Sequence, residues 1–328
     1  MSSRISVKIP VYNCAEFLER ALQSVLEQEV DPDLIDIEVI DDASNDSPEA
    51  VVRLFDSSRV KYYRKPINEG LTANFNTCVE RSCGDLVHIL HGDDFVNVGF
   101  YRSVLDAFER CPDVALYCCA CQIVEEKARY LRVDTIPLLR RSGSYDGFYH
   151  LLVPNNPVRT PTVVIPRWVY GSVGGFDVRL SHSTDWNMWL KASSCGPVYF
   201  ETRPLASYRQ SSSNASAGHM RTGRYLAEYY WARMLWIEER QPRNAAEYRD
   251  KTRQDILRRV VRDLEMHGLE KDRARLLLDL FEEEMPELLD EASRAIRSKM
   301  PRRRWREALS MRTPRQGEEC RLSSGATP

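Results

Sequence analysis

The first 121 residues alternate short apolar runs with longer amphipathic stretches. Apolar residues that alternate or run continuously predict strands, and apolar residues spaced three and four apart predict helices. Strands that alternate with helices of this length predict an α/β fold, with a mixed, mostly parallel sheet flanked by helices on both faces. The predicted strands are 5–9, 35–40, 60–63, 86–90 and 114–121, and the predicted helices are 15–28, 71–81 and 98–110, with a further helix start at Pro48.

Composition restricts the class of protein. The 328 residues are 43% apolar and 29% charged, as in globular proteins, and allow one large domain with an appendage. The net charge of −2 argues against nucleic acid as a general partner. No apolar stretch approaches the ~20 residues that cross a bilayer. The N-terminus runs directly into the first strand, so we expect no secretory signal. The nine cysteines show no zinc spacing, so we expect reduced thiols and a cytoplasmic location.

The tetrapeptide His91-Gly92-Asp93-Asp94 directly follows the predicted strand 86–90. Two adjacent carboxylates at the end of a buried strand repel each other and are costly to desolvate, unless a cation binds them. Magnesium prefers oxygen ligands and commonly binds one or two carboxylates together with substrate phosphates. The motif therefore indicates a metal site at the sheet edge where open α/β sheets bind their ligands. A solvated turn that caps the helix beginning near Val98 is the alternative.

Three further loops follow predicted strands and meet the same edge of the sheet. Pro10-Val11-Tyr12-Asn13 offers a stiff turn and a flat ring on which a base could stack. Asp41-Asp42 offers carboxylates that could accept hydrogen bonds from a base imide or a ribose hydroxyl. Asn68-Glu69-Gly70 precedes a helix N-terminus, which suits anionic ligands. Each loop alone is also an ordinary turn or cap, but four at one edge favour a ligand site.

The chain changes character in its second half. Residues 154–213 predict short strands and turns around one amphipathic helix at 185–193, and the chain from residue 222 onward is helical and highly charged. We expect a first domain of two halves followed by a helical extension with a basic tail. The expected boundaries are 1–215 for the domain, 1–121 and 122–215 for its halves, and 216–328 for the extension.

The segment 300–315 interleaves arginines with Trp305, Leu309 and Met311. A solvated basic tail is one interpretation. The other is a segment that binds peripherally to an anionic membrane surface, where each nearby basic residue contributes roughly 1 kcal/mol to the binding free energy. In that case the cytoplasmic protein would lie at the inner face of the membrane. The arginines are Arg302, Arg303, Arg304, Arg306, Arg312 and Arg315.

Taken in order, these motifs resemble the family-2 glycosyltransferases of the GT-A fold. The resemblance covers roughly residues 4–213. It implies a nucleotide-diphosphosugar-binding domain with a donor half and an acceptor half. It also implies sugar transfer, with inversion at the anomeric carbon, to the hydroxyl of a glycan, a lipid-linked saccharide or a small molecule. The matching segments are Pro10 to Asn13, Val39 to Asp46, Asn68 to Gly70, Leu90 to Asp94, Val173 to Asp177 and Thr184 to Leu190.

The resemblance implies roles for individual residues. Asp93 matches the last carboxylate of the family's metal-binding Asp-x-Asp and Asp94 follows it, which implies a divalent cation, Mn or Mg. Asp185 matches the general base, which accepts the proton of the acceptor hydroxyl as the new bond forms. The donor is expected to be a nucleotide-diphosphate sugar, with a UDP-sugar favoured. The positions that match the family's nucleotide contacts are Pro10, Tyr12, Asp41, Asp42, Asn68 and Gly70.

Three positions depart from the family's pattern. His91 replaces the first aspartate of the metal motif, and its imidazole could contact ribose or diphosphate instead. Thr184 replaces the glutamate before Asp185. Ser211 replaces the histidine of a Tyr-Arg-x-His motif, which removes a diphosphate or metal contact unless Arg209 or His219 supplies it.

Two other functions remain open on the sequence. A nucleotidyltransferase would need a glycine-rich, basic loop after the first strand, and Pro10 to Ala15 lacks one. A non-catalytic sugar-nucleotide binder is suggested by His91, Thr184 and Ser211. Turnover with sugar nucleotides and an acceptor extract would separate a binder from a transferase.

Overall fold

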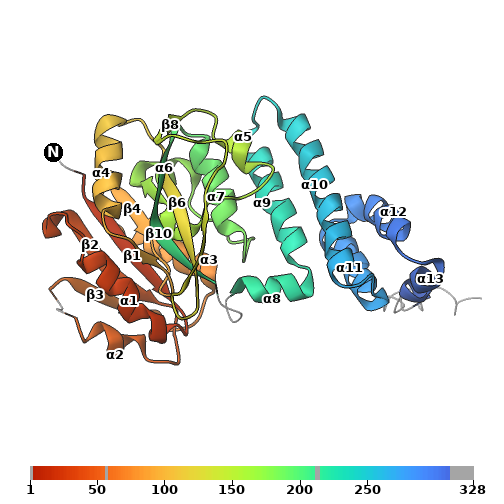
Figure 1. Cartoon of the computed structure of the whole chain (residues 1–328), viewed down its shortest axis with the longest axis horizontal. Helices are drawn as coiled ribbons and strands as arrows, with labels where there is room; N and C mark the ends of the chain where they lie inside the picture. The colour runs from red at the N-terminus through yellow and green to blue at the C-terminus, as the bar shows by residue number, and fades with distance from the viewer. Residues whose placement is uncertain (1–2, 56–57, 211–214, 311–328) are drawn as a thin grey trace, which may run out of the picture. The chain divides into compact units, whose positions relative to one another are not determined.

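The computed structural model describes residues 3–55, 58–210 and 215–310 (Figure 1). The chain forms two compact units. The first consists of Met1–His219 and Glu228–Thr252, and the second of Met220–Ala227 and Arg253–Pro328. Residues 220–227 therefore belong to the second unit, and residues 228–252 belong again to the first. The functional boundary expected at residue 215 stays a prediction.

A mixed sheet forms the centre of the first unit. In the described residues its strand order is β3-β2-β1-β4-β9-β6-β10-β5, with β7 beside β6 and β8 beside β10. β1 is parallel to β2 and β4, β2 to β3, and β6 to β10. β9 runs antiparallel between β4 and β6. The strands are β1 (Ile5–Val11), β2 (Ile35–Asp41), β3 (Val60–Arg64), β4 (Leu86–Ile89), β5 (Phe95–Val96), β6 (Leu116–Glu125), β7 (Tyr130–Asp134), β8 (Gly143–Tyr145), β9 (Val164–Pro166) and β10 (Val198–Gln210).

Helices cover both faces of this sheet (Figure 1). The side of β1 that carries Val7 and Ile9 belongs to one buried cluster with Leu18 and Leu22 of α1 and Val104 of α4. α3 packs on β1, β2 and β4, while α6 packs on β9 and α7 on β6. The helices of the first part of the chain are α1 (Ala15–Leu26), α2 (Pro48–Val52), α3 (Leu71–Glu80), α4 (Phe100–Arg110), α5 (Tyr149–Leu152), α6 (Arg167–Val173) and α7 (Thr184–Ser193).

The later helices carry the rest of the described chain. In the second unit, the apolar side chains of Ile256, Leu277, Phe281 and Ile296 are buried. No helix in the described part of the chain is both long enough and apolar enough to span a membrane. These helices are α8 (Ala215–Thr222), α9 (Tyr225–Arg240), α10 (Ala245–Met266), α11 (Lys271–Glu284), α12 (Leu289–Lys299) and α13 (Arg302–Ser310).

The predicted strands of the first half are confirmed as β1, β2, β3, β4 and β6, and the helices between them as α1 to α4. The second half differs in two places. Residues 167–173 form helix α6, although Trp168, Val169 and Tyr170 resemble a strand, because burial of Val169 and Tyr170 outweighs local propensity. β10 continues to Gln210 past Pro204 at an irregularity in its pairing with β6. β5 is too short to show a period.

Candidate active site

Reciprocal hydrogen bonds join the loop after β1 to the loop after β2. The backbone N–H of Asn13 donates to Ser44 Oγ at 3.0 Å, and the backbone N–H of Asn45 donates to Asn13 Oδ1 at 2.8 Å. Asn13 has φ +52°, which asparagine tolerates better than most residues. Pro10 is buried, whereas the Tyr12 side chain is 49% exposed, so the joined loops present a flat ring to solvent.

Asp41 is fully buried, and protein donors already occupy its carboxylate. It accepts hydrogen bonds from the backbone N–H of Ser44 at 2.8 Å and from the Tyr62 hydroxyl at 2.6 Å, and it pairs with Arg64. Burial raises the pKa of Asp41, but these donors outweigh burial and hold the pKa below its usual value. Asp41 therefore shapes the loop after β2 as a buried anion.

Asp42 connects this loop to the one before α3. Its Oδ1 accepts the backbone N–H of Glu69 at 3.1 Å, and its Oδ2 accepts that of Gly70 at 2.9 Å. The Lys65 ammonium lies 2.9 Å from the same carboxylate. Asn68 Oδ1 also accepts from Gly70 at 2.9 Å, and Gly70 has φ +88°, a conformation that favours glycine. The structure thus brings the predicted Asp42, Asn68 and Gly70 together at the N-terminus of α3.

His91, Asp93 and Asp94 form a cluster after β4. Ligand-type atoms of the three side chains all lie within 4.8 Å of one another. Asp94 is buried, and burial together with the charge of Asp93 raises its pKa well above the usual value. Burial lowers the pKa of His91, whose ring stacks on Phe75 with centroids 5.2 Å apart. Asp94 Oδ2 and His91 Nε2 are buried atoms with no hydrogen-bond partner in the described structure. Such an acceptor-rich cluster fits a cation.

Gly92 allows this cluster to approach β1 closely. Its backbone N–H donates to Pro10 O at 3.2 Å. A Cβ at this position would lie 2.7 Å from Val11 Cγ1 and 2.9 Å from Cys14 Sγ, closer than carbon atoms pack. The missing side chain of Gly92 therefore sets the spacing between the His91-to-Asp94 motif and the loop that carries Tyr12.

Arg209 of β10 fixes the same motif from the other side. Its backbone N–H donates to Asp94 Oδ1 at 2.8 Å, its Nε donates to Asp93 O at 2.8 Å, and its Nη1 donates to Glu126 O. These three bonds tie Arg209 to Asp94 and to two backbone carbonyls. The departure at Ser211 lies outside the described residues.

Asp185 lies in the first turn of α7 and is half-buried. Its Oδ1 accepts the backbone N–H of Trp186 at 2.6 Å, and the Thr160 hydroxyl lies 3.4 Å from Oδ2. Burial raises the pKa of Asp185 to about 6, and these donors oppose that rise. A carboxylate with this pKa is mostly ionised at neutral pH and is more basic than an exposed aspartate, as a general base requires.

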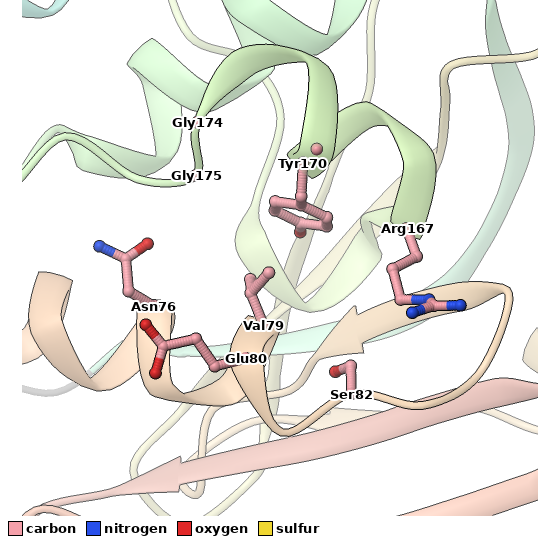
Figure 2. A pocket seen from close by; sticks show the side chains of 9 residues that line it. Asn76, Val79, Glu80, Ser82, Arg167, Tyr170, Gly174 and Gly175 are labelled. Atoms are coloured by element: carbon pink, nitrogen blue, oxygen red, sulfur yellow. The ribbon is translucent and has the colours of Figure 1, made fainter.

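Two polar side chains of α3 hold the segment that leads to Asp185. Asn76 Nδ2 donates to Phe176 O at 2.9 Å, and the Phe176 N–H donates to Asn76 Oδ1 at 2.9 Å. The Thr72 hydroxyl donates to Leu180 O at 2.5 Å. Figure 2 shows Asn76 below the Gly174–Gly175 turn, in a surface groove of about 540 Å³ that contains none of the predicted site residues.

Glu228 of α9 holds the last residues of that segment. Its carboxylate accepts the backbone N–H groups of Ser181, His182 and Ser183 at 3.0 to 3.2 Å, and the Ser181 hydroxyl at 2.7 Å. Burial raises the pKa of Glu228, but the donors of Ser181 and its neighbours lower it overall. The His182 ring stacks on His219, with centroids 4.8 Å apart. Burial and His219 lower the pKa of His182, which favours its neutral form.

Sequence reasoning did not select Thr160, Arg159, Asn76 or Glu228. Each is a single polar residue in a segment without a motif. Thr160 contacts Asp185, and the other three contact neighbouring segments that the fold brings together from distant parts of the chain. The segment before Arg159 is typical of an ordinary loop, and the segment around Asn76 is typical of an ordinary helix.

We expect Asn76→Ala to lower the free energy of unfolding by about 1–3 kcal/mol, because it leaves the Phe176 N–H and carbonyl without their partners. Thermal or urea unfolding measures the change. Glu80→Ala, one turn later on the exposed face of α3 and in the same groove, serves as the control and should unfold like the parent protein. Equal stability of the two variants would contradict this role for the amide pair.

Comparison with known proteins gives the class of this fold. The family model "Glycosyl transferase family 2" matches residues 6–164. Residues 6–164 therefore form a family-2 glycosyltransferase domain. An uncharacterized glycosyltransferase of Rickettsia typhi is 25% identical over 211 residues, which are 63% of this chain and 64% of that relative. This glycosyltransferase thus spans slightly less than two thirds of the relative's length.

Solved structures confirm the GT-A fold. S. aureus TarS 1-349 in complex with UDP-GlcNAc matches with a TM-score of 0.64 at 14% identity, covering 94% of this chain and 90% of that one. The mannosyltransferase PcManGT from Pyrobaculum calidifontis, in complex with GDP-Man and Mn2+, matches with a TM-score of 0.54 at 18% identity, covering 70% and 64%. At these identities the likeness extends to the fold of the glycosyltransferase and not to its substrates.

Proposed function

We propose that this glycosyltransferase moves a sugar from a nucleotide-diphosphate sugar, with a UDP-sugar favoured, to a hydroxyl acceptor with inversion at the anomeric carbon. The observation that carries the proposal is Asp185, a half-buried carboxylate with a pKa of about 6 in the same domain as the acidic His91-to-Asp94 cluster. The acceptor is a glycan, a lipid-linked saccharide or a small molecule.

Asp185 is proposed as the general base. It accepts the acceptor's hydroxyl proton while the acceptor oxygen attacks the anomeric carbon from the face opposite the leaving diphosphate, which produces inversion. The bonds from Trp186 and Thr160 hold its carboxylate in one orientation, and its raised pKa strengthens it as a proton acceptor. Asn76 and Glu228 fix the segment that delivers it.

Asp93 and Asp94, with His91 beside them, are proposed to hold a divalent cation, Mn or Mg. Asp94 Oδ2 is buried, accepts no hydrogen bond and lies 3.7 Å from His91 Nδ1. This environment and the raised pKa of the Asp94 carboxyl fit a cation, because an ionised pair of carboxylates is costly at this depth without one. When bound, the ion would neutralise negative charge on the donor's diphosphate. His91 adds a nitrogen donor where a carboxylate is usual, or contacts the donor itself.

The remaining predicted residues are proposed to form the nucleotide site. Tyr12 offers the exposed ring, supported by Pro10. Asp41 and Asp42 fix the loops around this ring. Their carboxylates already accept hydrogen bonds from the protein, so a hydroxyl or imide of the nucleotide would donate only to the lone pairs that remain. Asn68 and Gly70 present the N-terminus of α3 to anionic groups. TarS with UDP-GlcNAc and PcManGT with GDP-Man and Mn2+ share this fold, which supports a nucleotide-sugar donor.

A donor panel tests the proposal. The purified protein is incubated with UDP- and GDP-sugars, Mn or Mg, and an acceptor extract, and free nucleoside diphosphate is measured. We expect acceptor-dependent release with one donor and a product whose anomeric configuration, read by NMR, is opposite to the donor's. Binding without release would identify a sugar-nucleotide binder, and retention of configuration would exclude the proposed mechanism.

The basic segment is proposed to bring the enzyme to the inner, anionic face of the membrane from the cytoplasm. In α13 Arg302, Arg303 and Arg306 are exposed, Leu309 is 38% exposed and Trp305 is half-buried. Met311, Arg312 and Arg315 lie outside the described residues. Both surface charge and partly exposed apolar groups favour peripheral binding.

We expect salt-sensitive cosedimentation of the full chain with anionic liposomes, because this attraction is screened within ~8 Å at physiological ionic strength. A truncation after Lys299 should remain in the supernatant, and neutral liposomes serve as the control. Equal binding of the truncated and full chains would show that the segment is merely solvated.

A further inference from the structure

Arg159 lies in the loop before the short helical turn Thr160–Thr162. Its Nη2 and Nε donate to one oxygen of Asp134, at 2.9 Å and 3.3 Å. The guanidinium lies over the Tyr208 ring, 5.5 Å from the ring centroid. Its side chain is 37% exposed. Two of its nitrogens thus share a single acceptor on one edge, and the planar group is held in one orientation by the ring below it.

This position connects the two acidic parts of the site. The next residue, Thr160, contacts Asp185 at 3.4 Å. On the other side, Tyr208 precedes Arg209, whose backbone N–H donates to Asp94. Burial raises the pKa of Asp185 and of Asp94, and the positive charge of Arg159 acts against that rise at both. Arg159 is therefore near the base and near the acidic cluster at once.

The charge at this point suits an anion. The site holds the carboxylates of Asp93, Asp94 and Asp185, so a further negatively charged ligand needs positive charge beside it. Arg209 already donates from Nε to Asp93 O and from Nη1 to Glu126 O, and its charge faces Asp93 and Asp94. A guanidinium presents paired N–H groups that match phosphate oxygens.

We propose that Arg159 binds the diphosphate of the nucleotide-sugar donor and stabilises the negative charge that develops on it during transfer. This rests on the proposed function. In that step the acceptor oxygen bonds to the anomeric carbon and its proton goes to Asp185. The bond from the anomeric carbon to the β-phosphate oxygen breaks, and its electron pair stays on that oxygen. Arg159 stabilises the negative charge on the leaving β-phosphate oxygen, and Asp185 accepts the proton.

The test compares Arg159→Gln and Arg159→Lys with Arg132→Gln. Arg132 is a matched control, because its Nε donates to the other oxygen of the same Asp134 at 2.9 Å while its side chain is 52% exposed. Calorimetry with Mn measures binding of UDP, UMP and uridine, and of GDP, GMP and guanosine. Transfer assays measure KM for donor and acceptor separately.

For the series that the parent protein binds, Arg159→Gln should weaken nucleoside diphosphate binding by about 10- to 100-fold, the scale of a lost charged hydrogen bond. The nucleoside should bind as before, Arg159→Lys should be intermediate, and Arg132→Gln should match the parent. Equal losses for diphosphate and nucleoside would make Arg159 structural, and an unchanged diphosphate affinity with a raised acceptor KM would assign it to an acceptor anion. Either result overturns this inference alone. A parent protein that binds neither series and transfers no sugar would overturn the proposed function as well.

Discussion

Asp185→Asn should lower turnover by about a hundredfold or more while leaving donor affinity close to that of the parent protein. Asparagine has nearly the size of aspartate and can still accept the Trp186 N–H through its amide oxygen, but it cannot take a proton from the acceptor. Donor affinity is measured by calorimetry and turnover by release of the nucleoside diphosphate. A folded variant that transfers sugar near the parent rate would move the base elsewhere, with His182 the next candidate.

The pH dependence gives an independent readout of the same residue. Because the pKa of Asp185 is raised to about 6, its carboxyl is protonated and inactive below that pH, so parent turnover should rise as pH increases through 6. Residual turnover of Asp185→Asn should lack this limb. A parent profile that is flat between pH 5 and 7 would argue against Asp185 as the base.

Asp185→Asn should lower turnover but raise the stability of the folded protein. A carboxyl whose folded pKa is raised stabilises the folded state when protonated, and that contribution is lost as pH rises through the folded pKa. Asp185→Asn should therefore melt at a higher temperature than the parent above about pH 6, and this gain should shrink as pH falls from 6 toward 4. A more stable but inactive variant would rule out misfolding as the cause of lost turnover.

Asp93→Ala should remove the divalent-cation dependence of donor binding. The parent protein is expected to bind a UDP-sugar more tightly with Mn or Mg than with EDTA, because a cation between the carboxylates and the diphosphate relieves repulsion on both sides. The variant keeps Asp94 and His91 but loses one of two adjacent acidic side chains. Titration of donor into each protein, with and without metal, measures the difference.

Asp85→Ala is the control for this experiment. Asp85 precedes the same strand at its opposite end, where its carboxylate accepts the Arg4 N–H at 3.0 Å. Asp85→Ala also removes one carboxylate, but at the end of β4 opposite to the His91-to-Asp94 motif. The effect of metal on donor binding should therefore stay as in the parent protein. Asp93→Asn separates charge from size, and a normal metal response in both Asp93 variants would remove Asp93 from the metal site.

The fold of the first half was predictable because its sequence repeats one simple pattern. β1, β2 and β4 are almost wholly buried. Apolar residues alternate with polar ones in β1 and β2 and form a short run in β4, and both patterns are typical of strands. α6 was missed because its helix depends on packing rather than propensity, and β5 because two residues carry no period. Both lie where tertiary contacts decide the local structure.

The candidate site divides in the same way. His91, Asp93 and Asp94 could be selected because adjacent carboxylates directly after a buried strand are unusual, and Asp185 because it matches a motif of the resembling family. Their supports could not be. Thr160 meets Asp185 across 25 residues, and Asn76 meets Phe176 across 100. Sequence patterns report local periodicity, whereas these contacts depend on the order of strands in the sheet.

The carboxylate of Glu228 has a consequence for chimeric enzymes. Glu228 lies more than forty residues after Ser183 in sequence, yet it accepts the backbone N–H groups of Ser181, His182 and Ser183, directly before α7. Exchange of the C-terminal helices between glycosyltransferases would therefore remove part of the support of the segment before Asp185, the proposed base, unless the junction lies after Thr252, where the first unit ends. A recombinant catalytic fragment should be designed to the same limit, with α9 retained as an integral part of it.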